Sequence, residues 1–192
     1  METDPAFSEV YISVDIETAG PNPNDYSLLT IGACTIAESP QMFYVEIQPV
    51  NSKFVPEALA ISRLSMERLE KRGLAPKAAM AQFDEWVRAQ AQGDQKPVFV
   101  AFNAAFDWMF VNDYFHTYLG HNPFGHKALD VKAFFMGLTG ACWHETSMDA
   151  VSRRYVGARP LTHHALQDAI DQAEIFRRML AESQERAREF NR

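Results

Sequence analysis

The chain has 192 residues, which is enough for one ordinary domain with a substantial core. A hydrophobic fraction of 47% and an aromatic fraction of 12% exclude a disordered chain. The formal net charge of −7 argues against a protein that grips a long duplex through many phosphates. If the partner is nucleic acid, the charge favours a short or single-stranded end held by metal, although the same charge also suits a protein that is simply kept soluble.

Cysteine usage and targeting signals narrow the class further. Cys34 and Cys142 are the two cysteines, and neither belongs to a Cys-x-x-Cys pair, which argues against a disulfide framework or a zinc site. The acidic N-terminus METDPAFSEV lacks the features of a signal peptide, and the sequence has no long apolar stretch. We therefore expect a cytoplasmic protein that does not enter a membrane.

The first part of the sequence predicts three strands, over residues 9–17, 28–37 and 41–48, joined by short turn-rich links that favour an antiparallel meander. Helical and strand patterns then alternate. One or two helices are predicted over 56–72, broken near Ser62 and stopped at Gly73, and the next helix runs from Pro76 to about Gln92, where Gly93 ends it. A strand over 97–102 then leads into a helix from an Asn103 N-cap to about Tyr118. The remaining predictions are a short strand over 127–131, a helix ending at Gly137, a helix over 147–155, and a last helix from about His163 past Leu180.

These elements predict an α/β fold: a mixed five-stranded sheet, made of the antiparallel meander plus two parallel strands, flanked by helices. We expect residues 1–192 to form a single domain, with a core over about 9–183 and a charged, frayed tail over 183–192.

The first candidate site residues are Asp15 and Glu17, at the end of the first predicted strand. Residues i and i+2 of a strand share a face, so the two carboxylates point the same way while Val14 and Ile16 point into the opposite layer. Carboxylates roughly 7 Å apart can share a pair of metal ions. A strand with an acidic, solvated face is the competing interpretation.

Two further acids lie in apolar segments. Asp107 follows the fourth predicted strand and has Phe106, Met109 and Phe110 around it; a favourable interaction with the helix dipole would also explain it. Asp168 lies about 200° around the last helix from Leu166, off the predicted core stripe. Buried carboxylates are costly unless they are paired or bind a cation, so convergence on metal ions is the stronger interpretation.

Apolar residues at helical spacing predict a core stripe along the last helix. It comprises Leu166, Ala169 or Ile170, Ala173, Phe176 and Leu180. His163 stands close enough to Asp168 to share a pocket with it, but the adjacent His164 leaves the identity of the functional histidine open on spacing alone. Other acids are interpreted as structural: Asp130 and Asp149 as helix caps, and Asp113 as a surface residue.

Together these segments resemble the DEDDh 3′–5′ exonucleases, the superfamily of polymerase proofreading subunits, ribonuclease T and oligoribonuclease. The matching pieces, in the family's order, are DIETAG with Asp15 and Glu17, NAAFD ending at Asp107, and HHALQDA from His163 to Ala169. The family pattern His-x-Ala-x-x-Asp-Ala selects His163 over His164. Phe102 departs from the family, which often has a histidine there, and this leaves the subfamily and substrate open.

The resemblance implies a ribonuclease H-like fold and a metal-dependent 3′–5′ exonuclease that releases nucleoside 5′-monophosphates from single-stranded RNA or DNA ends. It implies that Asp15, Glu17, Asp107 and Asp168 hold two Mg²⁺ or Mn²⁺ ions and that His163 is the general base.

The resemblance also suggests contacts to the substrate and to other proteins. It places the terminal nucleotide against the backbone of Thr18, and Phe106 or Phe102 either stacks on a base or packs in the core. Because several relatives act as homodimers, a homodimer is possible. Two other functions stay open: a non-catalytic module that binds a nucleic-acid end or a polymerase, and a phosphodiesterase acting on small nucleotides.

Overall fold

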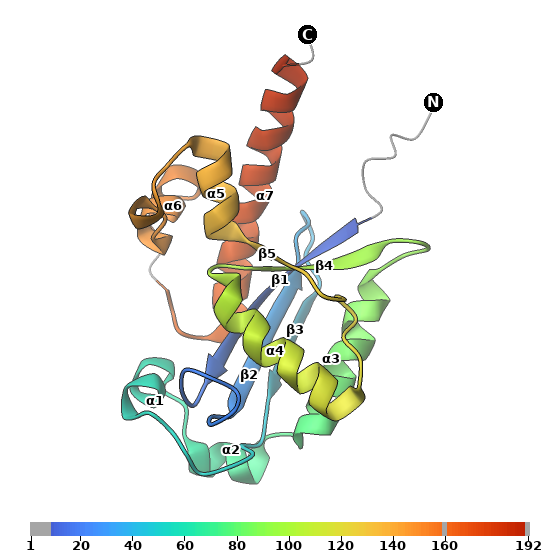
Figure 1. Cartoon of the computed structure of the whole chain (residues 1–192), viewed down its shortest axis with the longest axis vertical. Coiled ribbons are helices and arrows are strands. Elements are labelled where there is room, and N and C mark those ends of the chain that lie inside the picture. The colour runs from blue at the N-terminus through green and yellow to red at the C-terminus, as the bar shows by residue number, and fades with distance from the viewer. Residues whose placement is uncertain (1–8, 159–160, 191–192) are drawn as a thin grey trace.

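The computed structural model describes residues 9–158 and 161–190. Its centre is a five-stranded sheet in the order β3-β2-β1-β4-β5 (Figure 1). The strands are β1 (Glu9–Thr18), β2 (Leu28–Thr35), β3 (Met42–Glu46), β4 (Lys96–Ala101) and β5 (Ala128–Asp130). Strands β1, β2 and β3 pair antiparallel, whereas β4 pairs parallel with both β1 and β5. The mixed sheet predicted from the sequence, a meander extended by two parallel strands, is therefore confirmed.

Two short helices follow the meander, as the sequence pattern predicts. Helix α1 (Pro56–Ser62) begins with proline at its first position and ends at Arg63, whose φ of 56° is left-handed. Helix α2 (Met66–Arg72) is capped by the hydroxyl of Ser65, which accepts a hydrogen bond from the backbone N–H of Arg68. Gly73 ends α2, as expected.

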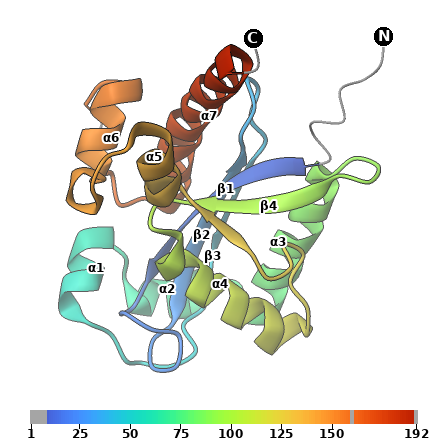
Figure 2. The ribbon, with the colours of Figure 1, turned by 45° about the horizontal axis from the view of Figure 1, so that its top comes forward.

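One face of the sheet packs against helices α3 (Pro76–Gln90) and α4 (Ala104–Leu119). The layer between them is apolar and rich in aromatic rings, and it includes Ile12, Val14, Ile16, Phe83, Phe99, Phe110 and Phe115. In Figures 1 and 2, α4 and α3 lie on one side of the strands and α7 on the other. The alternation along β1 therefore sends its large apolar side chains toward α3 and α4 and leaves its polar side chains for the opposite face.

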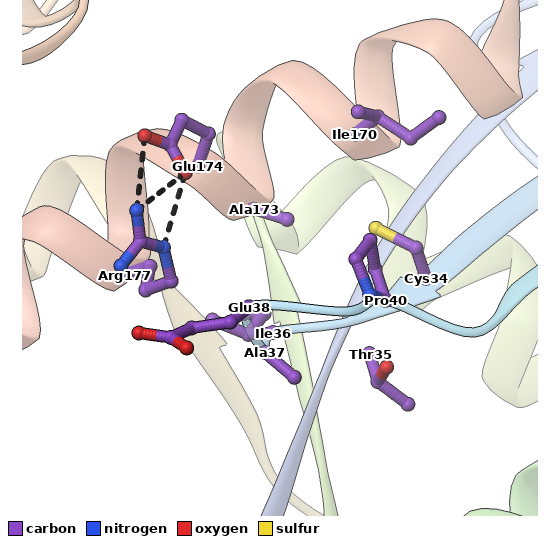
Figure 3. Close-up of a pocket in the computed structure, with 10 residues that line it drawn as sticks. All are labelled: Cys34, Thr35, Ile36, Ala37, Glu38, Pro40, Ile170, Ala173, Glu174 and Arg177. Atoms are coloured by element: carbon purple, nitrogen blue, oxygen red, sulfur yellow. Dashed lines mark hydrogen bonds and ion pairs between the residues drawn. The ribbon is translucent and has the colours of Figure 1, made fainter.

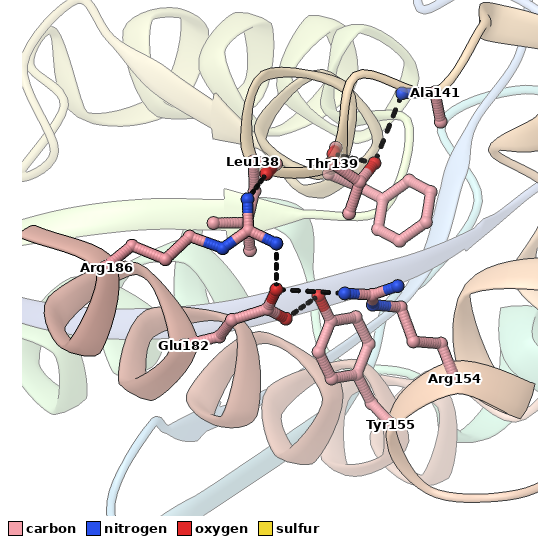
Figure 4. A network of polar contacts seen from close by, with 8 residues as sticks. Leu138, Thr139, Ala141, Arg154, Tyr155, Glu182 and Arg186 are labelled. Carbon is pink, nitrogen blue, oxygen red and sulfur yellow. Dashed lines mark hydrogen bonds and ion pairs between the residues drawn. The ribbon is translucent and has the colours of Figure 1, made fainter. Parts of the chain in front are cut away.

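The opposite face carries helix α7 (Ala165–Phe190), together with α5 (Val131–Thr139), the 3₁₀ helix η1 (Trp143–Glu145) and α6 (Met148–Tyr155). A polar network holds α5 and α6 onto α7 (Figure 4). In it, Glu182 accepts hydrogen bonds from Tyr155 at 2.7 Å and Arg154 at 2.9 Å, and Arg186 bonds both Glu182 and the carbonyl of Leu138.

Several helix ends differ from the sequence prediction. Gly137, the predicted end of α5, lies inside that helix, which ends at Gly140 with a φ of 75°. Helix α3 ends at Gln90, before the predicted stop at Gly93. The predicted frayed tail is helical through Phe190, because Arg186 and Glu182 tie its first turns to α5 and α6.

The buried face predicted for α7 was partly wrong. Leu166, Ile170 and Leu180 are only partly buried, whereas Gln172 and Ile175 are buried. Asp168, which the predicted stripe left outside, lies on the buried face and is 3% exposed. The error arose because the stripe was drawn through apolar residues alone, while the sheet face opposite α7 is partly polar. No helix within the described residues is long and apolar enough to cross a membrane.

Candidate active site

The candidate site lies where β1 ends and where α4 and α7 begin. Asp15 and Glu17 alternate with buried Val14 and Ile16, so both acids lie on the face of β1 that α7 covers. Asp107 is in the first turn of α4 and Asp168 in the first turn of α7. The partial positive charge of a helix N-terminus favours an acid at both positions.

Gly32 allows α7 to approach the sheet beside Asp15. The two residues are Cα partners across β1 and β2. A Cβ atom on Gly32 would lie 2.1 Å from the backbone nitrogen of Leu166 and 2.2 Å from the carbonyl carbon of Ala165. The first turn of α7 therefore rests directly on the backbone of β2, which brings Asp168 close to the acids of β1.

Buried polar side chains fix this contact. Gln172 is 1% exposed and uses both ends of its amide: its nitrogen donates to the carbonyl of Val14 at 2.8 Å, and its oxygen accepts from the N–H of Phe102 at 2.7 Å. Ser13 donates to the carbonyl of Ala169 at 2.7 Å. Gln172 on α7 thus joins β1 to the short segment between β4 and α4. The acids lie on β1, α4 and α7.

Asp107 reaches β1 directly. The backbone N–H of Ile16, the residue between Asp15 and Glu17, lies close enough to its carboxyl to lower the pKa and partly offset the effect of burial. The start of α4 is held differently from the sequence prediction. Asn103 occupies the N-cap position with a φ of 65°, but its side chain makes no capping bond.

The cap of α4 comes instead from Asp130 at the end of β5. One oxygen of its carboxylate accepts from the N–H of Ala104 at 2.6 Å, and the other accepts from Ala133 at 2.7 Å. Asp130 therefore caps both α4 and α5, which confirms its interpretation as a helix cap. The N-cap of α6 is Ser147, so Asp149 belongs to that helix's first turn and is not its cap.

The histidine predicted as the base lies with two of the acids. Glu17, His163 and Asp168 each offer a ligand atom, and these atoms lie within 4.8 Å of one another. His163 is exposed and has a φ of 55°, in a loop that Thr162 anchors. Both the N–H and the hydroxyl of Thr162 donate to the same oxygen of Asp168, at 2.8 and 2.9 Å. No sequence motif indicated Thr162, because its partner is recognisable only in the folded chain.

The acids repel one another in the metal-free protein. Burial, followed by the charges of Asp107, Glu17 and Asp168, raises the pKa of Asp15 well above its ordinary value. Burial also raises the pKa of Asp107, and burial together with the charge of Asp168 raises the pKa of Glu17 to about 7. Each of these four acids therefore acts on at least one of the others.

This donor set fits a hard divalent cation. Carboxylate oxygens are the ligands that Mg²⁺ and Mn²⁺ prefer, and the four acids supply enough negative charge for more than one ion. None of the ion pairs formed within residues 9–158 and 161–190 includes any of the four. A bound cation would offset the cost of burial and the mutual repulsion that raise the pKa values of Asp15, Glu17 and Asp107.

The remaining predicted residues lie nearby but in different environments. His164 points elsewhere than His163: its ring stacks on Tyr44 with centroids 5.0 Å apart. The hydroxyl of Thr18 donates to the carbonyl of Gly20 at 2.8 Å and is therefore already bound within the turn. Phe106 is partly buried and packs on Phe110, with ring centroids 5.5 Å apart.

A separate hollow of about 460 Å³ lies between the β2–β3 turn and α7 (Figure 3). Cys34 lies at one end of it, and the ion pair between Glu174 and Arg177 lies at the other. Burial raises the pKa of the Cys34 thiol to about 12, so this thiol is a poor nucleophile. The hollow contains none of the five predicted catalytic residues and is not the candidate active site.

The fold and the acid cluster define a class: nucleases with a ribonuclease H-like sheet whose carboxylates bind divalent metal. The RNase T family model, described as an exonuclease, matches residues 12–176, and the chain belongs to this family. It is a 3′–5′ exonuclease of the DEDDh superfamily, as the motifs predicted.

Individual relatives support this assignment. The chain is 44% identical over 177 residues to the 3′-5′ DNA exonuclease Cap18 of Escherichia coli, and the match covers 92% of this chain and 93% of the relative. Its fold is similar to the nuclease domain of 3′hExo, a DEDDh family member solved bound to rAMP, with a TM-score of 0.75, 15% identity, and coverage of 94% and 95%. It is also similar to Escherichia coli Exonuclease I solved with a dT13 oligonucleotide, with a TM-score of 0.67 and 17% identity, over 95% of this chain and 43% of that one.

Proposed function

We propose that this exonuclease shortens single-stranded DNA from its 3′ end and releases nucleoside 5′-monophosphates one at a time. The observation that carries the proposal is the convergence of Asp15, Glu17, Asp107 and Asp168 with His163 at the end of β1. DNA is favoured as the substrate because the 44% identical relative is named a 3′-5′ DNA exonuclease. The net charge of −7 favours a strand end over a long duplex.

The four carboxylates would hold two divalent ions. When bound, such ions polarise the scissile phosphate, lower the pKa of the attacking water and stabilise the leaving oxygen. Asp15 and Glu17 take their positions from the pleat of β1, and Asp107 from the first turn of α4 beside Ile16. Thr162 donates two hydrogen bonds to one oxygen of Asp168 and so fixes the orientation of this carboxylate.

His163 would accept the proton of the attacking water. Its side chain is exposed at the open side of the acid cluster, with a ring nitrogen within 4.8 Å of ligand atoms of Glu17 and Asp168. Imidazole suits this role because it exchanges protons near neutral pH. Thr162 anchors the loop beside it and so limits how far the histidine can move.

Two further residues would contact the terminal nucleotide. The backbone of Thr18 follows Glu17 directly, after an irregularity in the β1–β2 register. The exposed part of Phe106 lies one residue before Asp107 on the first turn of α4. Residues 1–192 would act as a single exonuclease domain in the cytoplasm, and Mg²⁺ or Mn²⁺ would serve as the metal.

Matched labelled oligonucleotides test the proposal. The purified protein is incubated with 5′-labelled single-stranded DNA, the same sequence as RNA, the DNA duplex and a dinucleotide, each with Mg²⁺, Mn²⁺ or EDTA. We expect a ladder that shortens from the 3′ end, fastest on single-stranded DNA and absent in EDTA. Preferential turnover of the dinucleotide would instead identify a phosphodiesterase acting on small nucleotides, and preferential turnover of RNA would overturn the proposed substrate.

A further inference from the structure

Beside the acid cluster lies an aromatic pair whose function the motifs do not explain. The rings of Tyr44 on β3 and His164 before α7 stack with centroids 5.0 Å apart and planes 18° apart. Both residues are exposed, Tyr44 by 36% of its surface. Most aromatic rings of this protein pack in its core, so two parallel rings at the surface are unusual here.

The sheet register places this pair on the same face as the acids. Asp15, Gly32 and Tyr44 are successive Cα partners across β1, β2 and β3. The first turn of α7 fills the space above Gly32, and His164 immediately precedes that turn. The Tyr44 ring therefore stands next to the beginning of α7, in the same row as Asp15.

A basic groove continues from the other side of the pair. The hydroxyl of Tyr44 donates to Glu46 at 3.4 Å, and the same oxygen of Glu46 accepts from Arg68 on α2 at 2.6 Å. Arg68, Lys71 and Arg72 line a shallow groove of about 350 Å³, in which Lys71 also pairs with Glu67 at 2.7 Å. Burial, followed by the charge and hydrogen bond of Glu46, raises the pKa of Tyr44 to about 12.

We propose that Tyr44 and His164 form a stacking platform for an unpaired nucleobase of the substrate strand, and that the groove on α2 receives the adjoining phosphates. An aromatic face beside a line of cations is the arrangement by which proteins bind single strands without reading sequence. Hydrogen bonding through Glu46 holds the tyrosine ring in place before substrate arrives. The proposal rests on the proposed exonuclease function, because the platform serves the same site.

The stack has a competing explanation, in which Tyr44 merely holds the loop of His163 in place. The two explanations differ in what the substrate base contributes. A platform loses its effect when the base is removed, whereas a structural clamp acts on every substrate equally.

The test combines base removal with substitution of the tyrosine. Single-stranded DNA with one abasic site, moved one position at a time from the 3′ end, is degraded by the wild-type protein and by Tyr44→Leu and Tyr44→Phe. Release of the first nucleotide gives kcat and KM for each pair. Tyr118→Leu, which alters a partly buried ring at the far end of α4, is the matched control.

We expect one abasic position to raise the KM of the wild-type protein about tenfold. Tyr44→Leu should raise KM by a similar factor on intact DNA and show no further loss at that position. Tyr44→Phe keeps the ring and should keep the abasic penalty at that position, while Tyr118→Leu behaves like the wild type. Replacing Arg72 with Gln should reduce the dependence of log KM on log salt by about 0.7. If no abasic position matters, or if Tyr44→Leu loses equally at all positions, there is no platform.

The experiment separates failure of the platform from failure of the proposed function. Degradation of intact DNA by the wild-type protein is measured first and tests the function by itself. Should Tyr44→Leu fail to fold, the abasic series on the wild-type protein and on His164→Leu still decides whether a base is bound.

Discussion

The protein contains two groups of carboxylates whose pKa values are shifted in opposite directions. Along the outer part of α7, Glu174 pairs with Arg177 and Arg178, and Glu182 pairs with Arg154 and Arg186. Partial burial would raise the pKa of Glu174, but hydrogen bonds from its two arginines more than offset this and lower it. The same balance lowers the pKa of Glu182.

At the end of β1 the balance is reversed. Burial and mutual repulsion raise the pKa values of Asp15, Glu17 and Asp107, and no arginine or lysine among the described residues pairs with them. The chain thus supplies its own cations to acids that hold helices together. In the proposed function, the acids at the end of β1 are instead neutralised by ions from solution, and the following substitutions test this difference.

The largest effect is expected from Asp15→Asn, which keeps the shape of the side chain but removes its charge. Cleavage of single-stranded DNA should fall on the order of 10³-fold or more, because the site loses a ligand at which transition-state charge is stabilised. Asp113→Asn, on the exposed side of α4, is the matched control and should cleave at the wild-type rate. Initial rates with saturating Mg²⁺ provide the measurement. Activity of Asp15→Asn within about tenfold of the wild type would contradict the assignment of the metal ligands.

The next largest effect is expected from replacing one of the two neighbouring histidines, His163 and His164. His163→Ala should lower kcat by about 10²- to 10⁴-fold, the usual contribution of a general base. His164→Ala should raise KM but leave kcat almost unchanged, because that ring stacks on Tyr44 and is not part of the group formed by Glu17, His163 and Asp168. Single-turnover rates on one substrate compare the two variants, and the opposite ranking would show that the wrong histidine was assigned as the base.

The metal-free protein should become less stable as pH rises. Because folding raises the pKa of Glu17 from 4.5 to about 7, the folded state holds a proton that the unfolded state has lost in this range. Its contribution is fully present below pH 4.5 and is lost as pH rises through 7, on the order of 2–3 kcal/mol. Urea unfolding in EDTA at pH 5 and pH 8 measures it, and Mg²⁺ should remove most of the difference. A metal-free protein that gains stability between these pH values would argue against a repulsive cluster.

The smallest effect is expected at the paired acids. Glu182→Gln should lower the free energy of unfolding by about 0.5–1 kcal/mol, because the exposed ion pairs it breaks are individually weak. Its cleavage rate should match that of the wild type. Thermal unfolding and initial rates report the two quantities, and a large loss of activity with normal stability would link this network to catalysis.

The sequence predicted the parts of the molecule that follow from local pattern. Alternation along β1 placed Asp15 and Glu17 together on one face, and Gly73 ends α2 as predicted. Helix ends marked by a glycine alone were less reliable. Gly137 faces open space inside α5, where it can adopt helical angles, so its presence did not stop the helix.

The contacts that assemble the site depend on residues far apart in the chain. Nothing in the sequence around Gln172 indicates that its amide joins Val14 to Phe102, and Thr162 acquires its role only once α7 is in place. Gly32 gave the best missed signal, since a glycine inside an apolar strand often marks a close approach of another backbone. Asp168 was predicted as a ligand but placed on the wrong side of its helix, because the polar layer beneath α7 was not foreseen.

Asp130 couples the beginnings of two helices. Its two oxygens accept from the first amide of α4 and from an amide in the first turn of α5, so unwinding the start of either helix leaves one oxygen without that partner. The amides of Ala104 and Ala133 should therefore exchange with deuterium at similar rates. Any event that loosens the start of α5 should also destabilise the start of α4, about one turn before Asp107.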